Sequence, residues 1–250
     1  MQVVVAHPDD ETFGCGSLLL HAASAGAVTA VCCATSGEAG EAPSGSHLSP
    51  ADLAGVRERE LRDAAALLRV GRVDLLGFTD SGMSGPAAPE SLVAAPFERV
   101  VAAVSECIDA VRPDVLITLD ASDGHRDHAR IRDASLAAAR STGVPRVYLQ
   151  CLPRSLMRRW VERMRQDRPD TEHLSADITG LGTPDEQITT VIDTTEFQGL
   201  RESAIAVHAS QTSPFEGLPD DLRRAFLATE HLRRVAPPWT GGLQETSLLL

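Results

Sequence analysis

Two short stretches of this chain combine histidine with carboxylates at a spacing that suits a metal ion. In the first, residues 7–11 (HPDDE), His7 and Asp10 are three residues apart across a turn fixed by Pro8, so both side chains could reach one ion. Asp9 is left between them as a free carboxylate. Catalytic zinc takes three nitrogen or oxygen ligands and keeps an open position for water, so this stretch offers two ligands and a base.

A third ligand is expected from the second stretch, residues 120–128. There His125 and His128 are three residues apart, so one could bind the metal while the other faces the substrate. Asp127 could orient a histidine through its other ring nitrogen. Each stretch alone is common in a solvated turn or at an acidic helix start. Together they supply the mixed donor set that zinc uses, although Fe(II) or Co(II) would accept the same ligands.

Both stretches follow apolar runs that predict buried strands. The expected strands are 2–6, 27–34, 73–76, 114–119, 146–150 and 188–192, and residues 231–235 could form another. The expected helices are 14–25, 52–68, 91–111, one from the end of the 120–128 loop to about residue 141, then 154–166, 196–208 and 219–229. This alternation predicts a Rossmann-like α/β fold with three α/β/α layers and a mostly parallel sheet. The two stretches should then meet at the carboxyl edge of that sheet.

We expect a single domain over residues 1–250. Residues 1–150 would form the Rossmann-like core, and residues 151–250 would complete it and act as a lid. The loops at 36–50 and 77–89 are rich in glycine, serine and proline, and long loops inside compact domains are often functional.

The composition excludes several classes of function. The net charge of −12 gives no general attraction for nucleic acids or anionic membranes. All 23 basic residues are arginine, so a lysine nucleophile is impossible. The five cysteines form no CxxC pair, and residues 1–10 do not resemble a signal peptide. We therefore expect a cytoplasmic enzyme of small molecules, without a nucleic-acid partner or stable membrane association. Its basic helix near 154–168 could serve a homo-oligomer.

These motifs resemble those of the zinc-dependent de-N-acetylases related to PIG-L and LmbE. Residues 6–11 (AHPDDE), followed by Gly14 and Gly16, are similar to the first signature of that family, and residues 124–128 (GHRDH) to the second. Fainter likenesses follow in chain order at residues 35–41, at Arg57 with Glu60, at residues 77–82 and at residues 208–211.

The resemblance implies one zinc held by His7, Asp10 and His128. It also implies Asp9 as the general base and His125 as the group that stabilises or protonates the tetrahedral intermediate. Arg126 departs from the family pattern, because proline is more usual there. The segment after Phe215 matches no part of the family pattern. Residues 80–83 most resemble the branch that works on mycothiol and its precursors.

Four further residues are expected near the substrate. Arg57 and Asp80 could hydrogen-bond sugar or inositol hydroxyls, although Arg57 could instead pair with Glu60 on the helix and Asp80 could be a turn residue. Glu38 is expected to line the site. His208 is expected to close the pocket or, alternatively, to be a core histidine.

The sequence therefore predicts a metal-dependent N-deacetylase of an N-acetylglucosamine-type or related small polar metabolite. Two alternatives keep the same site: an amidase of mycothiol-like thiol conjugates, and a tailoring deacetylase of a natural-product glycoside. A third alternative, from another class, is a metal-binding scaffold without turnover. A nucleotide-binding oxidoreductase is disfavoured, because no GxGxxG follows the first strand.

Overall fold

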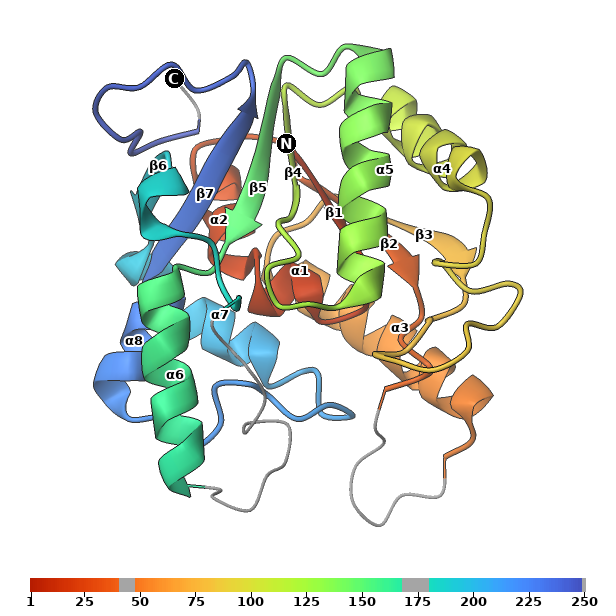
Figure 1. Cartoon of the computed structure of the whole chain (residues 1–250), viewed down its shortest axis with the longest axis horizontal. Helices are drawn as coiled ribbons and strands as arrows, with labels where there is room; N and C mark the ends of the chain where they lie inside the picture. Colours follow the sequence, from red (N-terminus) through yellow and green to blue (C-terminus); the bar gives the residue numbers. More distant parts are fainter. Residues whose placement is uncertain (41–47, 168–179, 249–250) are drawn as a thin grey trace.

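The fold is built on one twisted sheet, seen in a computed structural model that describes residues 1–40, 48–167 and 180–248 (Figure 1). The strand order is β3-β2-β1-β4-β5-β7-β6. The strands are β1 (Gln2–Val5), β2 (Ala30–Thr35), β3 (Arg72–Phe78), β4 (Val115–Leu119), β5 (Arg146–Cys151), β6 (Thr190–Asp193) and β7 (Thr229–Ala236). The first five in chain order pair in parallel, whereas β7 runs antiparallel to both β5 and β6. The predicted α/β fold with a mostly parallel sheet is confirmed.

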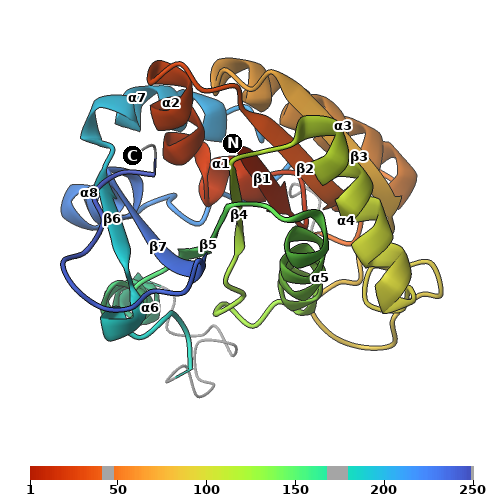
Figure 2. The ribbon, with the colours of Figure 1, turned by 90° about the horizontal axis from the view of Figure 1, so that it is seen from above.

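Helices cover both faces of the sheet, as continuous apolar strands require. They are α1 (Asp10–Phe13), α2 (Gly16–Ser24), α3 (Pro50–Leu67), α4 (Phe97–Val111), α5 (Arg126–Thr142), α6 (Arg154–Asp167), α7 (Gln198–Ile205) and α8 (Asp220–Leu227). Helices α2, α3 and α7 lie on one face, and α4 and α5 on the other (Figure 2). Each layer buries its own apolar cluster against the sheet. Helices α6 and α8 pack on each other beside the carboxyl end of β5, around Met157 and Phe226.

Several boundaries differ from the predicted ones for local reasons. Helix α4 begins at Phe97 rather than at residue 91, because residues 91–95 turn back onto Thr79 and Pro96 occupies the N-cap. The second stretch of interest ends in helix α5, whose N-cap is His125. The first stretch runs into the one-turn helix α1, which was not among the predicted helices. Within the described ranges, no helix combines the length and apolar character that a membrane crossing needs.

Candidate active site

The two stretches meet where the strand order reverses. Strand β1 pairs with β2 on one side and with β4 on the other, and the chain leaves both β1 and β4 at the same edge of the sheet. This switch point is where open α/β sheets bind their ligands. His7 follows β1 by two residues, and the loop after β4 leads into α5, which carries His128. The topology therefore brings together residues that are about 120 positions apart in sequence.

Three side chains present donor atoms to one point at this edge. His128 Nε2 lies 3.3 Å from His7 Nδ1 and 3.3 Å from Asp10 Oδ1. His7 Nδ1 lies 3.5 Å from Asp10 Oδ2. The Asp10 carboxylate is held in place by the backbone amides of Ala6 and His7. Two imidazole nitrogens and a carboxylate this close together form a group that could bind a metal ion.

Each of the two histidines also has a carboxylate behind it. His7 Nε2 lies 3.3 Å from Asp127 Oδ2, and His128 Nδ1 lies 2.5 Å from Asp123 Oδ2. A carboxylate accepts a hydrogen bond, so the outer nitrogen of each ring carries the hydrogen and the inner nitrogen keeps its lone pair for a cation. Asp127 is itself fixed, because Ser81 N donates to it at 2.8 Å. The sequence analysis anticipated an orienting role for Asp127 but missed Asp123.

The electrostatics of this group favour positive charge. Burial lowers the pKa of His7, but hydrogen bonds to Asp10, Asp127 and Asp80 outweigh it and hold that pKa well above its usual value. Burial likewise opposes the charge of His128, while Asp10 and Asp123 raise its pKa to about 10. For Asp10, burial is outweighed by the two histidines, which hold its pKa well below the ordinary range. The protons on the two histidines balance the negative charge of the surrounding carboxylates. A metal cation bound between the rings could balance the same charge in their place.

Other donor atoms lie nearby within the described ranges. His125 joins His7 and His128 in a group of three ring nitrogens within 4.8 Å of one another. Asp80 and Asp127 form a second group with His7, in which one ring nitrogen and two carboxylate oxygens lie within 4.8 Å of one another. Both of these carboxylates approach Nε2 of His7, on the side of the ring away from Asp10 and His128. The second group is therefore better explained as the support of His7.

Asp9 lines a pocket of about 330 Å³ together with His7, Asp10, His125 and His128. Its backbone has φ 134°, a conformation that side-chain-bearing residues rarely adopt and that structures retain mainly at functional sites. The conformation is held by Glu11, whose Oε2 accepts from Asp9 N at 2.9 Å. Burial, and then the charge of Asp10, raise the pKa of Asp9 to about 7. Asp9 is thus a carboxyl group able to exchange a proton near neutral pH.

His125 sits against both candidate ligand rings. Its ring centroid lies 4.7 Å from that of His7 and 4.7 Å from that of His128. Its Nδ1 accepts from the backbone N of Asp127 at 3.1 Å, so a neutral ring carries its hydrogen on Nε2. Burial and the positive charge of the neighbouring histidines lower the pKa of His125. It is therefore a neutral hydrogen-bond donor at neutral pH.

Arg57 and Asp80 line the same pocket, whereas Glu38 lies one step behind. The Arg57 guanidinium is buried and donates to Gly37 O. Asp80 Oδ1 accepts from Gly82 N at 2.8 Å, and the backbone N of Asp80 donates to Glu38 Oε1 at 3.1 Å. Burial raises the pKa of Asp80, but the hydrogen bond with His7 outweighs it, so its pKa is lowered. Glu38 thus supports the backbone that carries Asp80.

His208 lies under the site rather than in the pocket. It is 2% exposed, and its Nε2 lies 3.0 Å from Glu11 Oε1. Glu11 in turn holds the backbone of Asp9. The position of His208 is therefore that of a core histidine. A contact between His208 and the substrate stays a prediction.

Two further residues shape the pocket without having been singled out for it. Gln211 lines the pocket and donates from Nε2 to Pro8 O at 2.6 Å. Arg126, which stands where proline is more usual in the family that the chain resembles, donates to the carbonyls of Gly82, Ser84 and Gly85 and ties that loop to the start of α5. Glu41, at the end of the 35–41 likeness, lies outside the described residues.

Comparison with known proteins gives a family and several relatives. The family described as PIG-L, GlcNAc-PI de-N-acetylase, matches residues 2–139. A 1D-myo-inositol 2-acetamido-2-deoxy-alpha-D-glucopyranoside deacetylase of Kineococcus radiotolerans is 34% identical, over 84% of this chain and 68% of the relative. The family match includes both histidine-bearing stretches, because residues 2–139 extend from β1 into α5.

Solved structures share the fold. The N,N'-diacetylchitobiose deacetylase of Pyrococcus horikoshii superposes with a TM-score of 0.61 at 19% identity, covering 94% of this chain and 82% of its own. The 4-carboxy-2-hydroxymuconate hydratase GalB of Pseudomonas putida superposes with a TM-score of 0.64 at 18% identity, covering 97% and 98%. The fold thus carries at least two kinds of chemistry, and function has to be argued from the site.

Proposed function

Because the chain belongs to the PIG-L family of de-N-acetylases and is an amide hydrolase, we propose that it deacetylates a 2-acetamido-2-deoxyglucopyranosyl inositol. Eight relatives at 30–34% identity carry the name of that activity. The observation that carries the proposal is the convergence of His7, Asp10 and His128 in one pocket with Asp9 and His125.

Zinc is the metal we propose. Ligand atoms about 2.0–2.1 Å from a tetrahedral zinc lie about 3.3 Å from one another. The two ring nitrogens of His7 and His128 are 3.3 Å apart, and each lies within 3.3–3.5 Å of one of the two Asp10 carboxylate oxygens, so the residues fit such an ion. When bound there, zinc would polarise the amide carbonyl and make water a stronger nucleophile near neutral pH. Fe(II) and Co(II) would accept the same donors.

The chain's own residues supply the proton transfers. We assign to Asp9 the proton released as water attacks the amide carbon, because Asp9 lines the pocket and its pKa of about 7 suits transfer in either direction. His125 would donate from Nε2 to the oxygen on which negative charge develops. Asp127 and Asp123 would hold the ligand histidines in orientation. The amine leaves once its nitrogen has gained a proton from Asp9 or from His125.

The polar pocket suits the amino-sugar half of the substrate. Asp80, Arg57 and Gln211 offer acceptor and donor groups at its wall, which is the chemistry that hydroxyl groups require. Glu38 would act by holding the backbone of Asp80, and His208 by holding the carboxylate of Glu11. We also place the enzyme in a reducing compartment such as the cytoplasm, since all five cysteines are free thiols and four of them are buried.

The proposal is tested by supplying the acetamido glucosyl inositol to zinc-loaded protein and measuring primary amine and acetate together. Equal amounts of both products are expected, with loss of the reaction after chelation and recovery when zinc is returned. Free N-acetylglucosamine and N,N'-diacetylchitobiose serve as comparison substrates. Absence of amine from all three acetamides in metal-loaded protein would contradict the proposal.

A further inference from the structure

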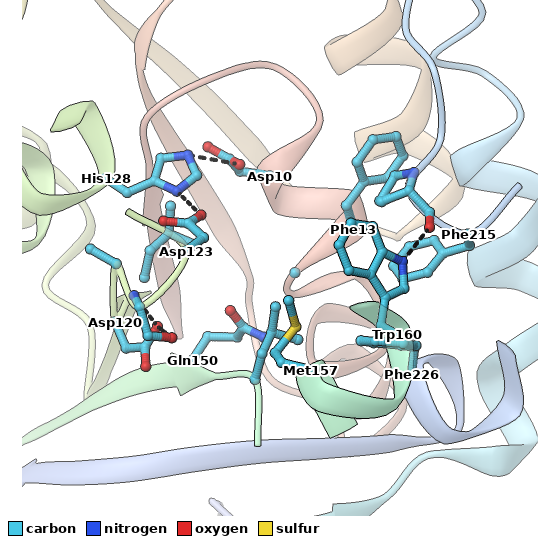
Figure 3. Close-up of a pocket in the computed structure, with 16 residues that line it drawn as sticks. Asp10, Phe13, Asp120, Asp123, His128, Gln150, Met157, Trp160, Phe215 and Phe226 are labelled. Atoms are coloured by element: carbon cyan, nitrogen blue, oxygen red, sulfur yellow. Dashed lines mark hydrogen bonds and ion pairs between the residues drawn. The ribbon is translucent and has the colours of Figure 1, made fainter. Parts of the chain in front are cut away.

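A second pocket borders the candidate metal group (Figure 3). Its volume is about 250 Å³, and it begins at Asp10 and His128, which also line the polar pocket. From there it extends to a wall of large apolar side chains. The wall is made by Phe13, Met157, Trp160, Phe215 and Phe226.

The aromatic wall is held together by its own contacts. The rings of Phe13 and Phe215 meet edge to face with centroids 6.0 Å apart, and those of Phe215 and Phe226 are 5.7 Å apart. Trp160 is anchored by a hydrogen bond from Nε1 to Pro214 O at 3.2 Å. These residues come from α1, α6, α8 and the segment before α8. A preformed apolar cavity with few polar contacts is typical of a small-molecule site.

The acidic groups at the near end of this pocket already have partners. Asp120 Oδ1 accepts from the backbone N of Ser122 at 3.0 Å and from its hydroxyl at 2.9 Å. Asp123 accepts from His125 N and from His128 Nδ1. Recognition in this pocket therefore depends mainly on apolar contact, in contrast to the pocket that holds Asp9 and Asp80.

An amide has two halves, and the two pockets differ in the half that they suit. The polar pocket suits a hydroxyl-rich amine, which leaves the apolar pocket for the acyl group. We propose that the apolar pocket binds the acyl chain, and that this enzyme prefers linear apolar N-acyl groups longer than acetyl on its amino sugar. The inference rests on the proposed function and extends it. In the reaction the C–N bond breaks, water supplies oxygen to the acyl carbon and a proton to the nitrogen, and a carboxylate and an amine leave.

A series of acyl lengths tests this directly. Zinc-loaded protein is given the N-acetyl, N-butyryl and N-hexanoyl forms of the same glucosaminyl inositol. Burying one methylene contributes about 0.8 kcal/mol, so kcat/KM should rise about fourfold for each methylene that enters the pocket. A value of kcat/KM that stays level or falls from acetyl to hexanoyl would overturn the proposal.

A filled pocket gives a second test. Leu152 lines the pocket and is half-buried, so Leu152→Trp should occupy the space of the chain. The ratio of kcat/KM for hexanoyl over acetyl should fall at least tenfold. The control is Leu243→Trp, the same exchange at a position that is 94% exposed and should leave the ratio unchanged. An unchanged ratio in folded Leu152→Trp would contradict the assignment, and if that variant does not fold, the length series decides.

Binding can be measured without turnover. The chain has two tryptophans, so Trp239→Phe leaves Trp160 as the only indole reporter. Hexanamide should then give a saturable change in fluorescence, and acetamide at the same concentration should give little. If no amide of any length is hydrolysed, the proposed function fails, and the fluorescence still decides the pocket: saturation supports an apolar-chain site, and no response to hexanamide overturns it.

Discussion

Asp123 and His128 are in hydrogen-bond contact at 2.5 Å, and the same carboxylate also accepts from the backbone N of His125 at 3.0 Å. One side chain in the turn before α5 therefore orients a candidate metal ligand and fixes the start of the helix that carries it. The contact directs Nε2 of His128 toward His7 and Asp10.

Asp123→Asn is therefore expected to weaken metal binding by about 10- to 100-fold, because removing a carboxylate behind a ligand histidine lowers the basicity and the order of that ligand. Competition with a chelator measures the affinity. Asp133→Asn is the matched control, since Asp133 lies on α5 with His128, is largely exposed and pairs with Arg132. Equal metal affinity in Asp123→Asn and wild type would contradict this assignment.

Arg126 links the loop that follows Asp80 to the helix that follows His125. Arg126→Gln removes donors to three carbonyls, two of them at 2.7 and 2.8 Å, so the loop should lose order. A loss of about 1–1.5 kcal/mol of substrate binding corresponds to a rise in KM of about tenfold, with a smaller change in kcat. Steady-state kinetics of this variant would be compared with Arg140→Gln, an exposed position near the other end of α5. An unchanged KM would show that the hydrogen bonds of Arg126 to the loop after Asp80 do not contribute to substrate binding.

His208 and Glu11 form a buried pair beneath Asp9. Burial lowers the pKa of His208, but the hydrogen bond and charge of Glu11 outweigh it and raise that pKa. His208→Ala leaves a buried carboxylate without this partner and should cost about 1–3 kcal/mol of unfolding free energy, measured by urea denaturation. The rate should fall as well, because Glu11 holds the backbone of Asp9. His21→Ala, at a half-buried position on α2, should change neither quantity by a comparable amount, and a similar loss there would show that the effect is not specific.

Glu230 predicts a dependence of stability on pH. Burial raises its pKa from an ordinary value near 4.5 to about 7, against the opposing effect of Arg201, whose Nη1 donates to Glu230 Oε1 at 2.6 Å. The native state thus binds this proton more tightly than the unfolded state. The resulting stability is fully present below about pH 4.5 and is lost as the pH rises through about 7.

The loss is on the order of 3–4 kcal/mol, at about 1.4 kcal/mol for each unit of pKa. It should be absent from Glu230→Gln. The measurement is the difference in unfolding free energy between the variant and wild type at pH 5 and pH 8, because His208 titrates in both proteins and cancels. A difference that does not change with pH would contradict the shifted pKa of Glu230.

The parts of the molecule that sequence could predict are those set by local pattern. The apolar runs before His7 and before Asp120 predicted β1 and β4, and the parallel topology then brought the two histidine-bearing stretches together. The antiparallel placement of β7 could not be read from TEHLRRVA, in which only Glu230 and Leu232 are buried and no pattern sets the direction of the strand. The single-domain description and the homo-oligomer stay predictions.

Side-chain partners formed by turn geometry were harder to foresee. Asp123 carries no signal beyond its position five residues before His128, and the structure shows that a loop conformation makes the contact. His208 could be matched to a motif, but its burial under Glu11 depends on how α7 packs against α1. The aromatic pocket gathers Phe13, Trp160 and Phe226 from distant segments, so no window of sequence contains it.

The central claim is that Asp9 is the base of a metal-dependent deacetylation, and its most direct test is the kcat of Asp9→Asn with metal content measured on the same sample. Asparagine keeps the size of the side chain but cannot accept the proton. We predict a full complement of metal and a kcat lower by a factor on the order of 10² or more. Metal-replete Asp9→Asn that releases amine within a few fold of the wild-type rate would contradict the account.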